Sequence, residues 1–310
     1  MSDATPSSFV ELVGCRLPLQ LAAMGGIGTP ELAASVSRAG GLGTVPGRRP
    51  DDVERSVEEM RASGEGPVAI SFLMPFLRRE SVEVAARLAD VVEFFYGEPD
   101  RELIEVAGRG GAVVGWQVGT AREATAARDA GCRLIAVQGV EAGGHLRGSQ
   151  PLDVVLEQTL RVVDVPVLAA GGIGTSERVE ELFDMGAVGV RIGTRFIAAA
   201  ECQAHPAYVG ALIGATARDT VVTEAFGADW PDAPHRVLRS ALRALERFEG
   251  EVVGSIGPWQ MPRASSVPPT RETEGVIEAM ALYAGESVEA VHGVVPAAQI
   301  VEELVGSRSA

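Results

Sequence analysis

Residues 137–148 read VQGVEAGGHLRG and form the most informative segment of this chain. An apolar run breaks there into a flexible turn whose one side chain able to titrate near neutral pH is His145. Two similar breaks follow: VPVLAAGGIGT ends its apolar run at residues 171–172, and AVGVRIGTRF ends its own at residues 193–194. Three consecutive strand-to-loop transitions therefore point to one end of a parallel sheet.

Short apolar runs alternate with longer segments of helical period along the chain, which is typical of βαβ units. Successive runs begin roughly twenty residues apart, which leaves room for one crossover helix in each interval. Eight such units close a TIM (β/α)8 barrel. The expected strands are Leu19–Ala22, Leu42–Val45, Val68–Phe72, Val91–Tyr96, Val113–Gln117, Leu134–Gln138, Val167–Ala170 and Val188–Ile192.

Several predicted helices carry the usual capping residues at their ends. Thr29 can cap a helix that opens with Pro30, and Gly40 can stop it. Thr120, followed by Glu123, fits a capping box. These signals agree with the barrel pattern.

After Ala200 the alternation of short apolar runs with segments of helical period stops. We expect an inserted, mostly helical domain at residues 203–273 over the barrel mouth, and a barrel built from residues 1–202 and 274–310. A final helix is expected from Pro296 to Leu304. An irregular surface extension without a role is the alternative for the insertion. One amphipathic helix is expected in it, with a shared face formed by Val237, Leu238, Ala241, Leu242 and Leu245.

Composition excludes several classes of protein. The net charge of -15, from 27 basic against 42 acidic residues, opposes nucleic acids and anionic lipid surfaces. No apolar run reaches the roughly 20 residues that span a bilayer, and the N-terminal sequence lacks a basic start followed by an apolar run. We therefore expect a cytoplasmic protein.

The cysteines and histidines show no metal-binding pattern. Cys15, Cys132 and Cys202 lie far apart without a CxxC pair, and the four histidines show no HxH or HxxxH spacing. We expect reduced thiols and no metal.

The two later glycine breaks fall where barrels often hold a phosphate, after strands seven and eight. Gly171 and Gly172 let backbone N–H groups approach an anion, and a helix opening near Thr175 adds the positive end of its dipole. Gly193 and Thr194 can add another N–H and a hydroxyl. GGIG alone is equally explained as a structural turn, but the pair of breaks predicts a phosphate site.

The run from residue 18 to 46, then QGVEAGGHLRG, VPVLAAGGIGT, GVRIGTRF and MALYAGESVEAV, resembles the nitronate monooxygenases, formerly called 2-nitropropane dioxygenases. The resemblance covers nearly the whole chain. It implies a TIM barrel that binds FMN without covalent attachment, with a smaller helical domain over the flavin.

Carried over residue by residue, the resemblance assigns the catalytic role to His145. It departs at two positions: the family usually has Pro where Ala23 stands and Asn where Ser71 stands, and the shorter Ser side chain puts a flavin contact there in doubt. The cofactor contacts implied are Ala22, Ala23 and Met24 along the isoalloxazine edge, Ser71, Gln138, Gly143, Gly144 and Ile192 around the flavin, and Gly171, Gly172, Gly193 and Thr194 at the phosphate.

The chemistry expected of His145 follows from its imidazole. It can remove the acidic hydrogen beside a nitro group or, once protonated, hold the nitronate anion. FMN would pass the electrons to dioxygen, giving a carbonyl compound and nitrite. The expected partners are a nitronate or nitroalkane and dioxygen, with neither nucleic acid nor membrane; a homo-oligomer is left open.

Several residues have two interpretations. Glu141 is a rival acid or base, although loop carboxylates more often bind backbone N–H groups. Trp116, Phe95 and Tyr96 either line the pocket or belong to the core. Residues 283–287 either approach the flavin or simply end a helix.

Two other functions compete. A group of NADH-dependent flavin enoyl-acyl-carrier-protein reductases shares the barrel and much of the EAGGH region, although an acidic carrier protein should prefer a more basic partner. A flavin-binding protein without turnover is the third hypothesis, and the presence of His145 argues against it.

Overall fold

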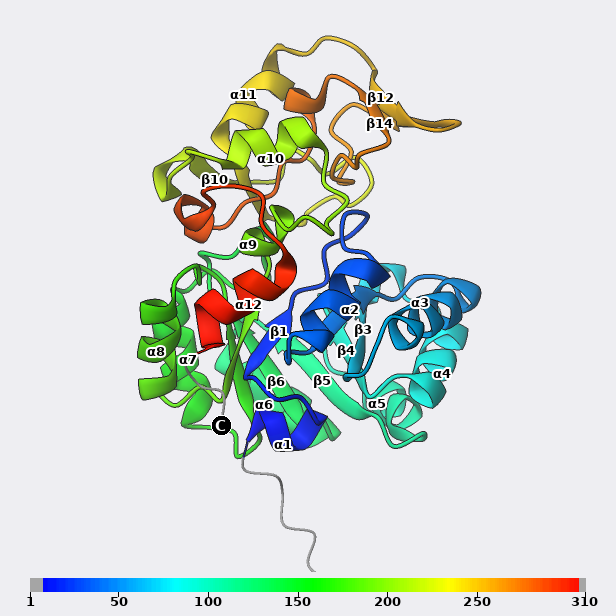
Figure 1. Ribbon diagram of the computed structural model, residues 1–310, viewed down its shortest axis with the longest axis vertical. Coiled ribbons are helices and arrows are strands. Elements are labelled where there is room, and N and C mark those ends of the chain that lie inside the picture. Colours follow the sequence, from blue (N-terminus) through cyan, green and yellow to red (C-terminus); the bar gives the residue numbers. More distant parts are fainter. Residues whose placement is uncertain (1–7, 307–310) are drawn as a thin grey trace, which may run out of the picture.

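The computed structural model describes residues 8–306, and it forms a barrel with a smaller segment stacked on one end (Figure 1). Residues 1–7, part of the N-terminal stretch that bears on cellular location, and residues 307–310 lie outside the described part.

Eight parallel strands build the barrel, in the order β1-β9-β8-β6-β5-β4-β3-β2. The backbone closes the circle between β1 and β2: the Leu21 N–H donates to the Leu42 carbonyl at 2.9 Å, and the Leu42 N–H donates to the Leu19 carbonyl at 2.8 Å. The eight strands expected from the sequence are thus confirmed. Their bounds are β1 Leu19–Leu21, β2 Gly43–Pro46, β3 Val68–Leu73, β4 Val91–Phe95, β5 Val113–Val118, β6 Leu134–Gln138, β8 Val167–Ala170 and β9 Gly189–Ile192.

Helices surround the barrel (Figure 1). The cap expected at Thr29 is present, because its side-chain oxygen accepts from a backbone N–H in the first turn of its helix, and Thr175, near which a helix was expected to open, caps α8 in the same way. The final helix is also confirmed. The helices are α1 Phe9–Val13, α2 Pro30–Arg38, α3 Pro50–Ala62, α4 Arg79–Leu88, α5 Arg101–Gly108, α6 Ala121–Ala130, α7 Leu152–Leu160, α8 Ser176–Asp184, α9 Thr194–Ile197 and α12 Ala297–Val305.

The capping box expected at α6 is only half formed. Thr120 accepts from the Glu123 N–H, but the Glu123 carboxylate accepts from the Gly119 N–H at 2.8 Å instead of returning to Thr120. Its other oxygen pairs with Arg147 at 2.8 Å. The nearly buried carboxylate of Glu123 pairs with the positively charged Arg147. The capping-box pattern in the sequence does not reveal this partner.

Alternating side chains divide the barrel wall into two apolar sets. Outward residues such as Ile70 and Val92 pack under the helices, whereas their strand neighbours point inward. The lower interior is filled by a separate apolar cluster. Its members include Leu42, Ala69, Val91, Val113, Leu134, Ala136 and Leu168 from the strands and Phe9, Leu12 and Val13 from α1.

The segment above the barrel is not mostly helical, and that expectation is corrected. Two three-stranded sheets accompany its helices, with strand orders β10-β11-β7 and β13-β12-β14. Val237 and Leu238, expected on a helix, lie in a strand, and the helix begins at Arg239. Its elements are α10 Pro206–Leu212, β10 Thr220–Thr223, β11 His235–Leu238, α11 Arg239–Arg247, β12 Val252–Ile256, β13 Trp259–Pro262 and β14 Thr273–Gly275.

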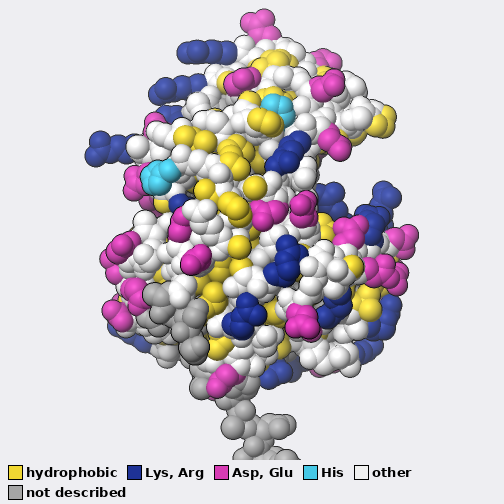
Figure 2. Space-filling view, viewed as in Figure 1, with side chains coloured by type: hydrophobic (Ala, Val, Ile, Leu, Met, Phe, Trp, Pro, Cys, Tyr) yellow, Lys and Arg dark blue, Asp and Glu magenta, His cyan; other side chains and the backbone are white. Residues whose placement is uncertain are grey.

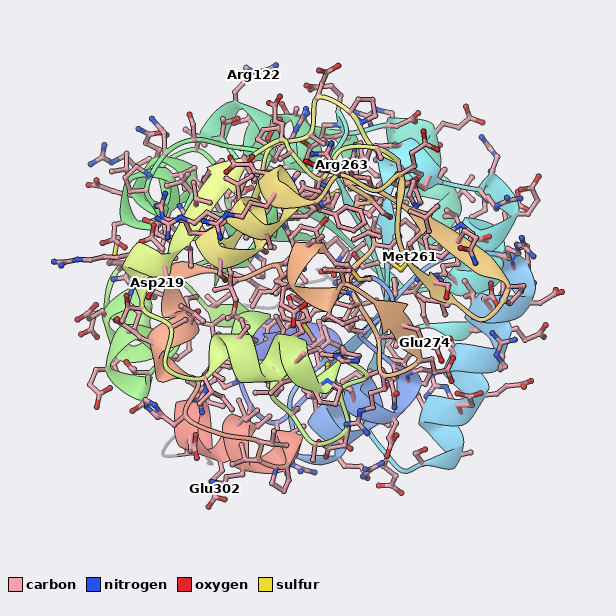
Figure 3. The ribbon with its side chains drawn as sticks, turned by 90° about the horizontal axis from the view of Figure 1, so that it is seen from above. Arg122, Asp219, Met261, Arg263, Glu274 and Glu302 are labelled. Carbon is pink, nitrogen blue, oxygen red and sulfur yellow. The ribbon has the colours of Figure 1, made fainter. Side chains whose placement is uncertain are left out.

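The segment covers one end of the barrel. In Figure 3, which looks down on that end, Met261 and Arg263 lie over the barrel, while Arg122 extends from its rim. Acidic and basic side chains are interspersed on the face shown in Figure 2. None of the helices in the described chain is long and apolar enough to cross a membrane.

Candidate active site

The three glycine-rich breaks meet at the end of the barrel that the segment covers. They follow the adjacent strands β6, β8 and β9, and the Gly139 N–H donates to the Ala170 carbonyl at 3.0 Å. The returning chain joins them, since the Gly285 N–H donates to the Thr194 hydroxyl oxygen at 3.0 Å. The common end expected for these loops is therefore present.

Close backbone contacts explain some of the glycines. A Cβ on Gly143 would lie 2.5 Å from the Gly285 nitrogen, so the EAGGH loop and the returning chain touch through bare backbone. Gly171 and Gly172 adopt φ values of 110° and 67°, which L side chains rarely adopt. Gly144, at φ 76°, has no atom within 4 Å of its ideal Cβ position.

Two of the expected cofactor residues point into the upper interior of the barrel. Ser71 and Gln138 lie two residues above Ala69 and Ala136 of the inner cluster, on the same side of their strands. Ile192 belongs to the outer core, so only its backbone faces this end; its carbonyl accepts from the Ala22 N–H at 2.8 Å. Ala23 is exposed and Met24 half-buried.

A buried layer of polar side chains lies between the apolar cluster that fills the lower interior and the upper end of the barrel. Arg191 forms an ion pair with Glu93, donates to Gln117 at 2.6 Å and donates to Gln20 at 2.9 Å. Gln20 also donates to Glu93 at 2.8 Å. The sequence patterns do not predict this network, although Gln20, Glu93 and Arg191 stand out as single polar residues inside apolar strands. Its buried charges are paired, as burial of charge requires.

His145 lies in the short strand β7, Gly144–His145, which pairs antiparallel with β11. The inserted segment thus adds a strand beside the residue expected to be catalytic. Aromatic rings surround the imidazole: the Trp230 ring stacks on it at a centroid distance of 4.0 Å, and those of Tyr283 and Tyr96 lie at 5.6 and 6.1 Å. Its Nε2 is buried without a hydrogen-bond partner among the described residues.

This environment makes His145 a neutral imidazole at physiological pH. Desolvation by burial, with a smaller contribution from His235, lowers the pKa of His145 from 6.5 to about 3. His145 is therefore able to accept a proton, but it is not an imidazolium before a ligand arrives.

His235 is the neighbour opposite His145 across the β7–β11 pair, and sequence analysis did not single it out. Its Nδ1 lies 2.8 Å from the Ala233 carbonyl, and its Nε2 accepts from the Phe226 N–H at 3.3 Å. Both nitrogens are thus engaged, which fixes a neutral tautomer with the proton on Nδ1. Its full burial also lowers its pKa.

Gln138 and Glu141 both support the loop that carries His145. The Gln138 amide donates to the His145 carbonyl at 3.0 Å, and its oxygen accepts from the Arg147 N–H at 3.1 Å. The Glu141 carboxylate accepts from the Leu152 N–H at 3.0 Å, which favours the structural role considered for it. Of the aromatic residues at the strand ends, Trp116 belongs to the outer core, whereas Tyr96 reaches His145.

A cavity of about 620 Å³ adjoins the site on the outer side of the His145 loop. His145 itself does not line it, whereas Val140, Leu146, Arg147 and Gly148 of the same loop do. Its wall combines apolar and uncharged polar groups with two arginines. The lining is Thr120, Ala121, Arg122, Val140, Leu146, Arg147, Gly148, Ser149, Gln150, Gln158, Val222 and Pro234.

The model of one known family, described as nitronate monooxygenase, matches residues 7–87 and 76–307. The chain belongs to the nitronate monooxygenase family. It is an oxidoreductase, and the resemblance inferred from the EAGGH and GGIG motifs is confirmed.

Similar proteins of this family and its neighbours differ in their names. The chain is 29% identical over 261 residues to a 5-hydroxy-7a-methyl-1-oxo-octahydro-1H-indene-4-carboxyl-CoA dehydrogenase of Rhodococcus jostii, covering 81% of this chain and 70% of the relative. Its fold is similar to that of FabK from Thermotoga maritima, at 30% identity, a TM-score of 0.80 and coverage of 97% and 95%. It is also similar to nitroalkane oxidase from Streptomyces ansochromogenes, at 28% identity, a TM-score of 0.79 and coverage of 96% of each chain.

The family implies a flavin cofactor, and the residues at the mouth fit one. The ideal Cβ of Gly193 meets only the Ala22 Cβ, at 3.5 Å, so this strand end leaves space beside it. The Thr194 hydroxyl accepts one hydrogen bond and keeps its proton to donate. No cluster of three or more metal-ligating side chains occurs within residues 8–306.

Proposed function

We propose that the protein is an FMN-dependent nitronate monooxygenase that oxidises alkyl nitronates with dioxygen to a carbonyl compound and nitrite. The observation that carries the proposal is the unpartnered Nε2 of His145, buried at the barrel end where the glycine loops meet. A buried polar atom without a partner is costly, and a substrate oxygen or C–H group there would give it one.

The residues of this chain have separate tasks. Gly171, Gly172, Gly193 and Thr194 would hold the FMN phosphate through backbone N–H groups and a hydroxyl. FMN, when bound, supplies electron transfer and the reaction with dioxygen. Ser71 and Ala23 stand where the family usually has Asn and Pro, and we propose that Ser71 contributes at most a water-bridged contact.

The neutral imidazole suits both forms of substrate. With a nitroalkane, His145 accepts the acidic proton at Nε2; with a nitronate, the negative charge beside Nε2 raises the pKa of His145 and favours the proton being held there. Gln138 holds the His145 backbone in place from below. The aromatic rings exclude water from the imidazole.

The test is an anaerobic mixing experiment with the yellow holoprotein. Ethylnitronate or propylnitronate alone should bleach the visible flavin absorbance, and admission of air should restore it with release of nitrite. A protein that binds FMN but is not bleached by either nitronate would contradict the proposal.

A second candidate is a flavin-dependent reductase or dehydrogenase of acyl thioesters. The cavity beside the His145 loop favours it, because its uncharged polar wall and its arginines suit a long chain bearing amides and hydroxyls. The carboxyl-CoA dehydrogenase and FabK likenesses are compatible with it. Rapid anaerobic bleaching by NADH, with no response to nitronates, would favour this candidate.

A further inference from the structure

Trp230 is the ring in closest contact with His145, and it comes from the inserted segment. The two rings stack at 4.0 Å between centroids with an interplanar angle of 22°. The Tyr96 ring meets the indole edge-on at 4.5 Å, and Phe76 meets it at 5.1 Å from the outside. The indole therefore closes a chamber of aromatic rings around the imidazole.

The closed chamber blocks the chemistry proposed for His145. Its Nε2 has neither solvent contact nor a hydrogen-bond partner. A solute can reach this atom only if one of the surrounding rings moves. The unpartnered nitrogen also favours such a movement, since an entering ligand would restore its lost hydrogen bond.

Trp230 is the ring best placed to move. Its side chain is 8% exposed, but both residues before it and both after it are exposed, whereas Ala233, further along the loop, is buried. Its indole N–H makes no hydrogen bond to the described residues. His235 is held through both ring nitrogens, and Tyr283 donates its hydroxyl to the Ser266 carbonyl at 2.7 Å. Tyr96 follows a barrel strand directly.

Besides the ring contacts of Trp230 and the Leu146 N–H, which donates to the Pro234 carbonyl at 2.8 Å, three hydrogen bonds to the turn at residues 264–266 hold this loop closed. The Asp229 carboxylate accepts from the Ser265 hydroxyl at 2.6 Å and from the Ser266 N–H at 3.3 Å. The Ala228 N–H donates to the Ala264 carbonyl at 3.0 Å. These hydrogen bonds, two of them to Asp229, hold the Trp230 loop against the turn at residues 264–266.

Backbone strain is concentrated at the same contacts. Within residues 8–306 the non-glycine residues with positive φ are Tyr96 at 68°, Asp232 at 55° and Ala264 at 64°. Tyr96 contacts the Trp230 ring, Asp232 lies two residues after it, and Ala264 accepts the hydrogen bond from its loop. Strained backbone persists only where surrounding contacts hold it, which is typical of switching segments.

We propose that Trp230 is the gate of the active site: the loop at residues 227–234 opens to admit substrate to His145 and closes with the indole as one wall. The inference rests on the proposed function for its choice of substrate. Rings with centroids 4.0 to 6.1 Å from that of the imidazole leave no room for a substrate while the loop is closed, and a limited opening at Trp230 makes room for only a small one. The gate therefore selects short alkyl nitronates over nitronates with bulky substituents.

The gate can be tested without turnover, by peptide-resolved modification of histidines with diethylpyrocarbonate. The exposed His292 serves as the internal reference. Trp230→Ala and Asp229→Ala should each raise the rate at His145 relative to His292 by about tenfold, the effect of losing one aromatic or hydrogen-bonded contact on a local opening equilibrium. Trp259→Phe, which changes an exposed indole outside the site, should leave the ratio unchanged.

Asp229→Ala changes an exposed residue and keeps the Trp230 ring, so the test survives if Trp230→Ala fails to fold. Unchanged modification of His145 in both variants would overturn the gate.

Substrate selection is measured separately, as the ratio of kcat/KM for the nitronate of phenylnitromethane to that for ethylnitronate. The ratio should rise in Trp230→Ala. Faster modification of His145 with an unchanged ratio would overturn the selective role, whereas faster modification without any nitronate turnover would uphold the gate and remove the proposed function.

Discussion

In the barrel, each strand pairs with strands that are its neighbours in sequence, apart from the pair β1–β9, whereas the segment above it is held by pairs between distant residues. β3 and β4 are separated by one helix, but β7, at residues 144–145, pairs with β11 near residue 235. Local patterns therefore predict the first region and miss the second.

The largest effect is expected at the point where the two regions meet. His145→Ala should lower nitronate turnover by about 10²- to 10⁴-fold, the usual contribution of a general acid or base. FMN should remain bound, because the glycine loops that would hold it are unchanged. Steady-state kinetics and the visible flavin spectrum measure the two properties. His292→Ala is the matched control, and retained turnover in His145→Ala would move the catalytic role to another residue.

A large loss of stability is expected inside the barrel. Arg191→Met leaves the carboxylate of Glu93 buried without its ion-pair partner, and this should cost about 3–5 kcal/mol. Urea unfolding measures the change. Arg55→Ala, which breaks an exposed pair with Asp52, should have little effect. Equal losses in the two variants would show that the buried layer does not stabilise the barrel.

A smaller, local effect is expected where the segment is fastened to the barrel. The buried Arg236 donates to the Val140 carbonyl at 2.8 Å and to the Thr220 hydroxyl oxygen at 3.0 Å. Arg236→Met should cost about 1–3 kcal/mol, the effect of leaving such acceptors unpaired. Hydrogen exchange should quicken in β10 and β11 but not in β3 to β5. Faster exchange throughout the barrel would contradict a separate fastening of the segment.

The smallest effect is the dependence of stability on pH. Because the folded pKa of His145 is about 3, against 6.5 for an exposed His, the unfolded chain binds a proton more readily between these values. The contribution of the neutral, buried His145 to the free energy of unfolding is complete above pH 6.5 and declines as pH falls toward 3. Between pH 6.5 and 5.5 the loss should be about 1 kcal/mol.

Thermal melts of the wild type and His145→Asn at these two pH values measure this contribution. The variant should show the shallower pH slope, with His235 supplying part of what remains, since its pKa is also lowered. Identical slopes would show that His145 is not buried as a neutral group.

Much of the candidate site could be predicted because its residues lie at strand ends. Ala170 ends β8 and Gly193 follows β9, so a correct strand list places the glycines and His145 at one end of the barrel. Trp230 and His235 could not be found in this way. They approach His145 only through strand pairing across some ninety residues, and no local period records that pairing.

The pairing within the buried polar layer below the barrel mouth could not be predicted from the sequence either. Gln20, Glu93 and Arg191 are visible as polar residues within apolar runs, but their positions in sequence do not reveal that they are partners. They meet because the strands that carry them are wrapped into one cylinder with their side chains on its inner face.

The eight-unit barrel, the end at which its loops gather and the family of the chain can all be inferred from residue order, because strand alternation, helix caps and glycine turns act over a few residues. The environment of His145 arises only in the folded chain. Burial, ring stacking and the lowered pKa are properties of groups brought together from distant parts of the chain, and their energies depend on distance in space and on exclusion of water.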